Sequence, residues 1–432
     1  MRVAEAAHIV VRGSPRKRYW ALRRQIENLS ALRRPGVRPF ARVLFRDWIR
    51  FLFGIVRPIN GQTRERAEAA TAWLLRAQHA TSDDGVSLGY FPCRAGTTAG
   101  WLDSYPETTG YIIPSLLELA ERLGREDVRE CALKMAAWEI SVQMPSGAVQ
   151  GGMVCAPDRQ VAAVFNTGMV LQGFSAAYRA TGESRFREAG QRAADFLVAD
   201  MGDDGHFRSH GAFVAQDSIK TYNCLCGWAL WLFAEDAEDE RYAKIAVRAA
   251  DATLRQQQSN GWFANNCLND PEAPVSHTIG YTLQGILEIG IRADRDDLIT
   301  GVKRGIAPVI GRISPNGFLP GCFFSNWEPA TFSSCLTGNA QLAVVCYRLY
   351  EVTGNDEYRQ AADRLVDYLK ALQILDGRDP GVVGAIGGSF PLLGSYMTLG
   401  YPNWATKYFL DGLMLQDRLS VGSRGGAERT DG

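Results

Sequence analysis

Residues 242–291 read YAKIAVRAADATLRQQQSNGWFANNCLNDPEAPVSHTIGYTLQGILEIGI, and this stretch decides the fold. It begins with an alanine-rich segment of 3.6-residue period, Tyr242–Gln256, whose apolar stripe is interrupted by charged residues. The turn Asn260-Gly261 and a loop of aromatic and polar residues follow, and the next segment, His277–Ile291, is apolar nearly all round. The stretch therefore predicts a helical hairpin with one solvated outer helix and one buried inner helix.

The same unit recurs along the chain, and its turn dipeptides mark the repeat. They are Asp84-Gly85, Ser146-Gly147, Asp204-Gly205, Asn260-Gly261, Asn316-Gly317 and Asp376-Gly377. Successive glycines lie 62, 58, 56, 56 and 60 residues apart, which is too regular for chance punctuation. Outer helices are expected at Arg64–Gln78, Phe186–Val198, Tyr242–Gln256 and Tyr358–Gln373, and inner helices at Thr108–Leu123, Asn166–Ala180, Tyr222–Ala234, His277–Ile291, Leu336–Val352 and Pro402–Leu415.

Six such hairpins predict an all-α fold, an (α/α)6 toroid with two layers of helices. Short linkers around Gly124 and Gly354 return the chain on the opposite face. The alternative is an open solenoid of helix pairs, although solenoid repeats are usually shorter, at about 20–45 residues. We expect the toroid to cover residues 61–416, after a basic helical extension (1–60) and before a Gly-rich, charged, flexible tail (417–432).

The N-terminal extension carries most of the charge asymmetry. Residues 1–60 hold 14 Lys and Arg against 3 Asp and Glu, whereas the whole chain balances at 47 and 47. Helices are expected at Tyr19–Ile26 and Phe40–Phe53, and the second places Arg42, Arg46 and Arg50 on one face. A basic amphipathic helix is typical of binding to an anionic membrane surface or to a membrane-bound partner. The alternative is an extra helix that packs across the toroid with its arginines simply solvated.

The composition limits the classes of protein and the cellular compartments that we expect. Hydrophobic residues make up 46% of the chain and charged residues 22%, as in ordinary soluble proteins, and no uncharged run reaches the 18 residues of a membrane span. Nine scattered cysteines and the lack of a secretory leader favour a reducing cytoplasm. The basic extension has few aromatics suited to stacking on bases, so no nucleic acid partner is expected. We expect a cytoplasmic protein, peripheral at the inner membrane.

The loops that enter the inner helices should gather at one mouth of the toroid. Free backbone N–H groups and the positive ends of helix dipoles there favour an anionic or hydroxyl-rich ligand. The loops are rich in aromatic rings, which stack on sugars, and in side chains that hydrogen-bond to hydroxyls. The expected substrate-binding residues are Trp101, Asp103, Tyr105, Asn166, Lys220, Asn223, Asn265, Asn266, Tyr281, Trp327, Asn339, Gln341, Tyr396, Asn403, Trp404 and Lys407.

Three carboxylic acids of these loops are candidates for catalysis. Glu107 lies in the first turn of an inner helix, where it either complements the helix dipole or transfers a proton. Asp217 and Glu328 are candidates for a second carboxylate, and the alternative for Asp217 is an ordinary ion pair with Lys220. Glycosidases need two carboxyls, about 5–5.5 Å apart in retaining enzymes and about 6.5–9.5 Å apart in inverting ones.

Two further candidates are not acids. His277 begins an inner helix, where it is either a structural hydrogen-bonding residue or a proton shuttle near neutral pH, and Tyr222 is a candidate base. His206 and His210 have a spacing compatible with a metal but lie in a loop, and the chain has no CxxC, HExxH, GxGxxG, P-loop or GxSxG motif. We therefore expect neither a metal nor a cofactor.

Five loop segments carry a resemblance: YPETTGY (105–111), NGWFANNC (260–267), CLTGNAQ (335–341), GSFPLLGSY (388–396) and YPNWATK (401–407). With the predicted architecture over residues 61–416, the chain resembles the six-hairpin glycosidase superfamily, which includes unsaturated glucuronyl hydrolases. Similar toroids occur in polysaccharide lyases and glucuronyl 5-epimerases. The segments also look similar to proteins encoded with bacterial exopolysaccharide genes. No catalytic motif matches residue by residue, so no catalytic role carries over.

The resemblance and the loop residues together favour a carbohydrate-active enzyme of polysaccharide or glycoconjugate biosynthesis. It would act on an acidic, uronate-containing oligo- or polysaccharide by acid/base chemistry, as a glycoside hydrolase does. A uronyl 5-epimerase or polysaccharide lyase is the alternative reaction, and Tyr222, His277, Lys220 and Tyr396 would matter more for it. Two other classes stay open: a non-catalytic glycan-binding scaffold, and a terpene-cyclase-like toroid, whose DxDD cluster the chain lacks.

Overall fold

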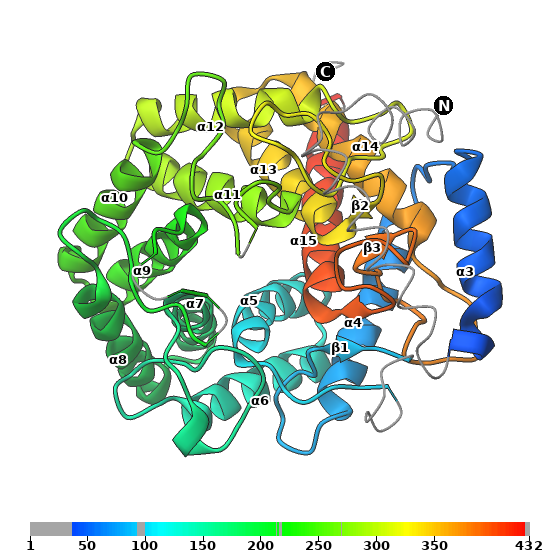
Figure 1. The fold of residues 1–432 in the computed structure, drawn as a ribbon. Helices are drawn as coiled ribbons and strands as arrows, with labels where there is room; N and C mark the ends of the chain where they lie inside the picture. Colours follow the sequence, from blue (N-terminus) through cyan, green and yellow to red (C-terminus); the bar gives the residue numbers. More distant parts are fainter. Residues whose placement is uncertain (1–36, 93–99, 213, 216–217, 269, 428–432) are drawn as a thin grey trace.

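The computed structural model describes residues 37–92, 100–212, 214–215, 218–268 and 270–427, and they form the predicted all-α toroid (Figure 1). An inner ring of helices is enclosed by an outer one. The outer helices are α4 (Thr63–His79), α6 (Glu126–Val142), α8 (Ser184–Asp200), α10 (Glu240–Leu254), α12 (Asp296–Ile310) and α14 (Asp356–Leu372). The inner helices are α5 (Pro106–Leu123), α7 (Val164–Thr181), α9 (Cys224–Ala237), α11 (Ser276–Arg292), α13 (Leu336–Thr353) and α15 (Asn403–Ala427).

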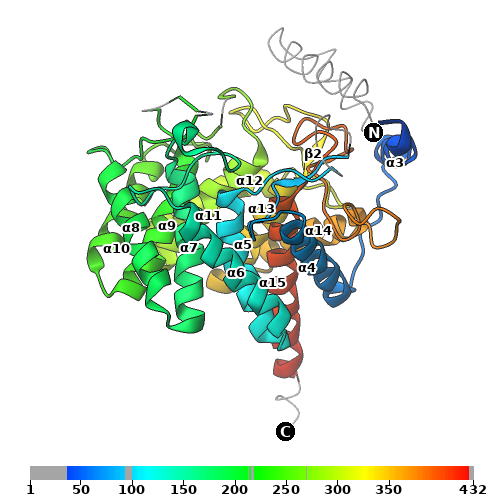
Figure 2. The same ribbon diagram turned by 90° about the horizontal axis from the view of Figure 1, so that it is seen from below.

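The ring is closed, which excludes the open solenoid. Each inner helix packs against the next one along the chain, and α15 packs against both α5 and α4. From α6 to α14, each outer helix packs most extensively on the inner helix that precedes it across a short linker, and three of these linkers begin with a left-handed glycine, Gly124, Gly182 or Gly354. The long loops instead step from one outer helix to the next inner helix, which places them all on one side of the ring (Figure 2).

Short pairings tie these long loops together. Strand β1 (Gly89–Tyr90) pairs antiparallel with β4 (Tyr401–Pro402), and β2 (Ser334–Cys335) pairs antiparallel with β3 (Ser389–Phe390). Two 3₁₀ turns, η2 (Pro157–Arg159) and η3 (Thr221–Asn223), complete the loop structure. The β1–β4 pair joins the first and last repeats of the chain, so it helps to close the ring on the mouth side.

Close backbone approach explains four of the repeated glycines, whereas Gly85 packs against the Trp138 and Ser104 side chains. Gly147, Gly205, Gly261 and Gly317 have φ of 84–85°, a region that favours glycine. A Cβ added to Gly317 would collide with the carbonyl oxygen of Arg364 in α14. The other three approach the backbone of the next outer helix in the same way.

The last repeat corrects the expectation for Asp376-Gly377. Gly384, with φ of 91°, packs on the carbonyl oxygen of Ala69 in α4, and so takes the place that Gly377 was expected to hold. The repeat is longer here, which displaced the equivalent glycine by seven positions.

Helix α3 (Val37–Leu52) lies outside the ring, against the loops of the mouth (Figures 1 and 2). The sequence predicts this helix, but the expected arginine face divides: Arg42 and Arg46 are exposed, whereas Arg50 turns toward the toroid and donates a hydrogen bond to the Ala371 carbonyl oxygen at 2.8 Å. The expected helix at Tyr19–Ile26 lies outside the described residues.

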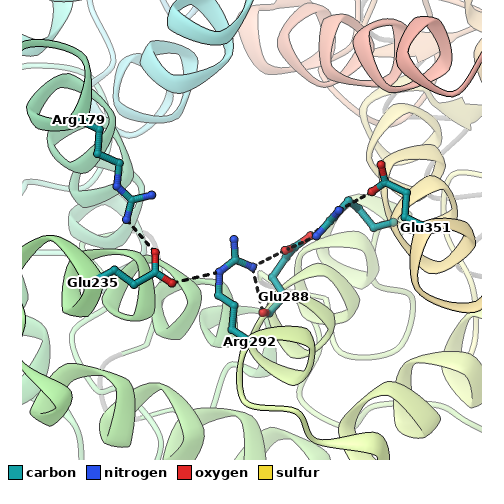
Figure 3. Close-up of polar contacts among 6 residues, drawn as sticks. Arg179, Glu235, Glu288, Arg292 and Glu351 are labelled. Carbon is teal, nitrogen blue, oxygen red and sulfur yellow. Dashed lines mark hydrogen bonds and ion pairs between the residues drawn. The ribbon is translucent and has the colours of Figure 1, made fainter. Parts of the chain in front are cut away.

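The C-terminal ends of the inner helices are joined by ion pairs (Figure 3). We call this network the ion-pair floor, because it lies at the end of the ring opposite the mouth. Glu288 of α11 is buried and accepts from Arg292 and from Arg348 of α13, both at 2.7 Å. Its members are Arg179, Glu235, Glu288, Arg292, Arg348, Glu351 and Arg418, from five of the inner helices.

Two expectations concern the ends and the membrane. Helix α15 continues to Ala427, so part of the segment expected as a tail is helical. Within the described ranges, no helix combines the length and the apolar character that crossing a bilayer requires.

Candidate functional site

A pocket lies in the mouth, where five of the six inner helices begin. Glu107 comes from α5, Phe165 from α7, Tyr222 from the turn before α9, His277 from α11 and Trp404 from α15. The full lining is Tyr105, Glu107, Gly151, Gly152, Ala163, Phe165, Asn166, His210, Val214, Tyr222, Leu268, His277, Thr278, Tyr281, Tyr396, Met397 and Trp404. The pocket therefore lies where the sequence places the chemistry.

Among the described residues that line the pocket, Glu107 is the only carboxylic acid. Pro106 occupies the first position of α5 and fixes the chain direction, so the Glu107 side chain follows in the first turn. The Tyr105 hydroxyl donates a hydrogen bond to Glu107 Oε2 at 2.7 Å. Burial raises the pKa of Glu107 to about 7, against the opposing effect of that hydrogen bond. Glu107 can thus give or take a proton near neutral pH.

His277 is held neutral beside it in the same pocket. Its Nδ1 donates a hydrogen bond to Gln341 Oε1 at 2.9 Å, and the Gln341 amide in turn donates to Gln284 Oε1 at 3.2 Å. This orientation makes Nε2 the basic nitrogen of the neutral ring. Burial lowers the pKa of His277 to about 3, although the bond to Gln341 acts in the other direction. Gln341, an expected substrate-binding residue, thus sits behind the histidine as its support.

Aromatic rings form one wall of the pocket. The rings of His277 and Tyr281 lie 4.1 Å apart, and Phe165 packs edge-on against Tyr281 and Tyr222 at 4.7 Å and 5.4 Å between centroids. Burial raises the pKa of both tyrosines above its usual range, so each phenol is a proton donor rather than a phenolate. The wall offers flat apolar surface with hydroxyl groups at its edges, which is the surface that sugar rings prefer.

The loop before α15 supplies further lining residues, and the Tyr396 ring lies 5.8 Å from the His277 ring. Ser389 Oγ donates to the Tyr396 carbonyl at 2.6 Å and accepts from its amide at 3.0 Å, which fixes this loop. Trp404 Nε1 donates to the Tyr396 hydroxyl at 2.9 Å. Met397 follows with φ of 47°, a conformation that non-glycine residues rarely adopt and that is often found at functional sites. These contacts hold Tyr396 and Trp404 rigidly against the pocket.

Lining residues that the sequence did not select as site residues include His210, Phe165 and Met397. His210 Nε2 donates to the Ser218 carbonyl at 2.6 Å, and its Nδ1 accepts from Asn223 at 3.3 Å. Burial is the main cause that lowers the pKa of His210, so this imidazole is also neutral. His210 lies in a polar loop that the sequence places at the mouth, and its four-residue spacing from His206 also suggested a metal site. Phe165 and Met397 carried no polar signal at all.

Several expected substrate-binding residues lie elsewhere. Trp101 packs on Trp73 and Tyr90, and Trp327 packs on Trp262, so these rings stabilise the loops. Lys407 pairs with Asp411 at 2.7 Å beneath the pocket. Lys220 donates to the Leu268 carbonyl at 2.9 Å, next to the pocket wall. Asp103 and Asn265 are exposed and do not line the pocket. Of the expected catalytic acids, Glu328 is likewise exposed and away from the lining, and Asp217 lies outside the described residues.

The buried asparagines tie loops to inner helices. Asn166 Nδ2 donates to the Gln150 carbonyl at 2.8 Å, and Asn403 Nδ2 donates to the Ser87 carbonyl at the same distance. Asn266 accepts from Thr282, and Asn339 accepts from Ser334. Of these four, Asn166 also lines the pocket. An Asn near the start of an inner helix therefore marks a loop anchor before it marks a ligand contact.

In the described part of the chain, no group of three or more His, Cys, Asp or Glu side chains is placed to hold a metal ion. His206 and His210 are both buried. His210 uses its two ring nitrogens in the hydrogen bonds given above.

Comparison with solved structures identifies the fold. The chain superimposes on an unsaturated glucuronyl hydrolase specific for heparin with a TM-score of 0.67 at 14% identity, over 83% of this chain and 97% of that one. A cellobiose 2-epimerase from Bacillus thermoamylovorans gives 0.66 at 12% identity, over 82% and 98%. A D-mannose isomerase gives 0.63 at 12% identity, over 82% and 97%.

Sequence comparison adds nothing to this: no model of a known protein family matches the chain, and no curated protein matches it. The likeness is one of fold, and it spans nearly the whole length of each neighbour. The chain therefore has the (α/α)6 toroid fold of the six-hairpin glycosidase-like enzymes.

Proposed function

We propose that the protein is a carbohydrate-active enzyme that acts on an acidic, uronate-containing glycan by acid/base chemistry in the mouth of the toroid. The observation that carries this is the position of Glu107 in the pocket, where burial raises its pKa to about 7, close to neutral pH. A carboxyl so placed is a general acid when protonated and a general base when ionised. The neutral His277 in the same pocket supplies a second group for proton transfer.

Two observations support a sugar as the ligand. The pocket joins a flat aromatic wall to a few polar groups, a combination suited to sugar rings. The three solved neighbours described above act, by their names, on glucuronyl groups, cellobiose and mannose. For an acidic glycan, support comes from the inner-helix N-termini that meet at the pocket and from Lys220, whose ammonium group lies against the rim residue Leu268.

The reaction has two candidates. Hydrolysis of a glycosidic bond needs a second carboxyl beside Glu107, and Asp217 is the residue proposed for it, since Glu328 is exposed away from the pocket. The second candidate is epimerisation or elimination at C5 of a uronate, where a base removes the proton beside the carboxylate. The contact between the His277 and Tyr281 rings, whose centroids lie 4.1 Å apart, favours this candidate, because with Tyr222 in the same wall it places a neutral imidazole and proton-donating phenols together.

We further propose a setting for the reaction: biosynthesis of polysaccharide or glycoconjugate at the cytoplasmic side of the inner membrane. The surplus of 11 positive charges in residues 1–60 supports an anionic surface as the working location.

The reactions are separated by incubating the protein in D2O with uronic-acid oligosaccharides, both saturated and unsaturated. Hydrolysis would produce new reducing ends without C5 deuterium. Elimination would produce the ultraviolet absorbance of a C4–C5 double bond, and epimerisation would place deuterium at C5 of intact chains, detected by NMR. If none of the oligosaccharides reacts or binds, the proposal is wrong; if they bind without reacting, the protein is a glycan-binding scaffold.

Substitution of Glu107 by Gln tests the assigned residue. We expect Glu107→Gln to lower kcat by about 10²–10⁴-fold, because proton transfer by a positioned side chain contributes about that factor. Asp158→Asn is the matched control: Asp158 is an exposed acid on η2, and its loss should leave the rate unchanged. Equal rates for Glu107→Gln and wild type would remove Glu107 from the mechanism.

A further inference from the structure

Helix α3 has two unlike faces, and the inner face packs against the toroid. Leu44 and Phe51 are buried, and Phe51 packs against Phe318, Phe332 and Phe390 at 5.8–6.2 Å between ring centroids. The polar side chains on this face form hydrogen bonds with the toroid. Arg50 donates to the Ala371 carbonyl, and Asp47 accepts from the Leu392 amide. The helix is therefore anchored to the rim of the toroid.

The outer face is apolar. Phe45 is 70% exposed, Phe53 is 71% exposed and Leu52 is 39% exposed, and Ile49 lies between them half-exposed. These positions, i, i+4, i+7 and i+8, form one stripe of a helix. Ile55, just after the helix, adds a side chain that is 53% exposed. Seven large hydrophobic residues are exposed in the described chain, and four of them belong to this short segment.

Cationic side chains flank the stripe. Arg42, Arg46 and Arg57 are all exposed. Asp47 is the one acidic residue between positions 37 and 60, and it faces the toroid. The outer face thus combines aromatic and aliphatic side chains with positive charge and has no acid to oppose it.

We propose that the outer face of α3, formed by Phe45, Ile49, Leu52, Phe53 and Ile55 with Arg42, Arg46 and Arg57, docks the protein on an anionic lipid surface. Phenylalanine and leucine side chains enter the boundary between headgroups and acyl chains, while arginines bind lipid phosphates. A lipid surface is favoured over a protein partner because exposed apolar side chains lie on one stripe of the helix and the charges that flank them are all positive, which matches an anionic bilayer surface. The inference deepens the membrane setting of the proposed function and rests on it for the choice of lipid.

Docking in this way also orients the site. α3 packs on Phe318 and Phe332 in the mouth-side loops and on Phe390 in β3, so the mouth is held near the membrane (Figure 2). The ion-pair floor then faces away from it. The substrate class that this geometry serves is a glycan carried at the lipid surface.

The test is flotation of the full chain with vesicles of phosphatidylcholine alone or with about 30 mol% phosphatidylglycerol, which gives the vesicles a negative surface potential. We expect binding to the anionic vesicles, weakened by salt. The double variant Phe45→Ser/Phe53→Ser and the variant Arg42→Glu/Arg46→Glu should each lower the bound fraction at least tenfold. The control is Val352→Ser, which removes an exposed apolar side chain at the end of α13, on the side of the floor.

Each outcome decides the proposal. Absence of wild-type binding, or binding unchanged in the Phe45→Ser/Phe53→Ser variant, overturns it, and the second result would assign binding to other residues. Loss of binding in Val352→Ser to the same extent would show a non-specific effect and would also overturn it. The measurement needs no substrate, and both α3 variants should retain wild-type turnover of any soluble oligosaccharide, so failure of docking is distinct from failure of the proposed function.

Discussion

At the scale of single residues, the pocket shows how one environment produces both reactivity and instability. The burial that raises the pKa of Glu107 to about 7 also makes its ionised form unfavourable in the folded state. In the unfolded chain the same carboxyl ionises near its ordinary pKa of 4.5. The folded protein therefore holds this proton more tightly between these two pH values, and it loses stability as the pH rises through them.

A measurable consequence concerns thermal unfolding. Glu107→Gln should have nearly wild-type stability at pH 4, where the carboxyl is largely protonated in both states. At pH 8 it should be more stable than wild type by about 1–3 kcal/mol, since a tenfold change in proton affinity is worth about 1.4 kcal/mol and the side chain is not fully enclosed. Calorimetry across this range checks the prediction. A variant that is less stable at pH 8 would show that Glu107 is ionised and well solvated.

Tyr105 adjusts the same proton in the opposite direction. Its hydroxyl donates to Glu107 Oε2, which favours the carboxylate and lowers the pKa of Glu107. Tyr105→Phe removes that bond but keeps the ring beside Trp404. The limb of the kcat/KM profile that reports Glu107 should then move to higher pH, while the other limb stays in place. An unshifted profile with lower kcat would instead make Tyr105 a substrate contact.

The sequence could predict those site residues that are polar and also lie near the start of a predicted inner helix. Glu107 and His277 are polar residues in the first turns of predicted inner helices, so the sequence could place them in the mouth. Tyr396 and Trp404 were found from loop composition. Phe165, in the first turn of α7, and Met397, in a loop, could not be found, because an apolar side chain looks the same in the sequence whether it faces a ligand or the core.

At the scale of elements, the turns recur regularly because four of their glycines contact the backbone of the next outer helix. A loop can follow its outer helix closely only where no side chain separates it from the next outer helix, and this holds for Gly147, Gly205, Gly261 and Gly317. The expected turn at Gly377 was wrong, because a longer final loop moves the contact to Gly384. Dipeptide composition marks such a turn, whereas only the three-dimensional contact decides which glycine makes it.

Substitution of two glycines separates backbone strain from contact. Gly317 and Gly354 both have positive φ, at 85° and 68°, but only Gly317 is pressed against a neighbouring helix. Gly354→Ala should cost about 1–2 kcal/mol for the left-handed conformation alone. Gly317→Ala should cost about 3 kcal/mol or more, because it adds collision with the Arg364 carbonyl and the Tyr368 side chain. Urea unfolding of the two variants gives the comparison, and equal losses would contradict it.

At the scale of the whole molecule, the ring needs contacts that close it at both ends. At the mouth, β1 pairs with β4 and joins the first repeat to the last. At the opposite end, the ion-pair floor connects helices α7 to α15 through side chains of alternating sign. Two of the basic members, Arg179 and Arg292, lie in the last turns of α7 and α11, where they also complement the negative ends of the helix dipoles. The open mouth and the tied floor give the toroid one face for chemistry.

The ion pairs of the floor should contribute unequally to the free energy of unfolding, and the buried pairs should contribute most. Glu288 is 4% exposed and accepts from Arg292 and Arg348, so Glu288→Gln leaves two guanidinium groups without their shared carboxylate. We expect a loss of about 2–4 kcal/mol in the free energy of unfolding, below the full cost of a completely enclosed pair because both arginines are partly solvated. Glu235→Gln breaks a half-exposed pair with Arg179 at the same end and should cost less than about 1 kcal/mol.

Denaturant unfolding of both variants, at low and at high salt, distinguishes a buried ion pair that supports the ring from a solvated surface network. If the two losses are equal, or if salt abolishes the effect of Glu288→Gln, the floor is a solvated charge pattern and ring closure depends on the helix packing and the strand pair alone.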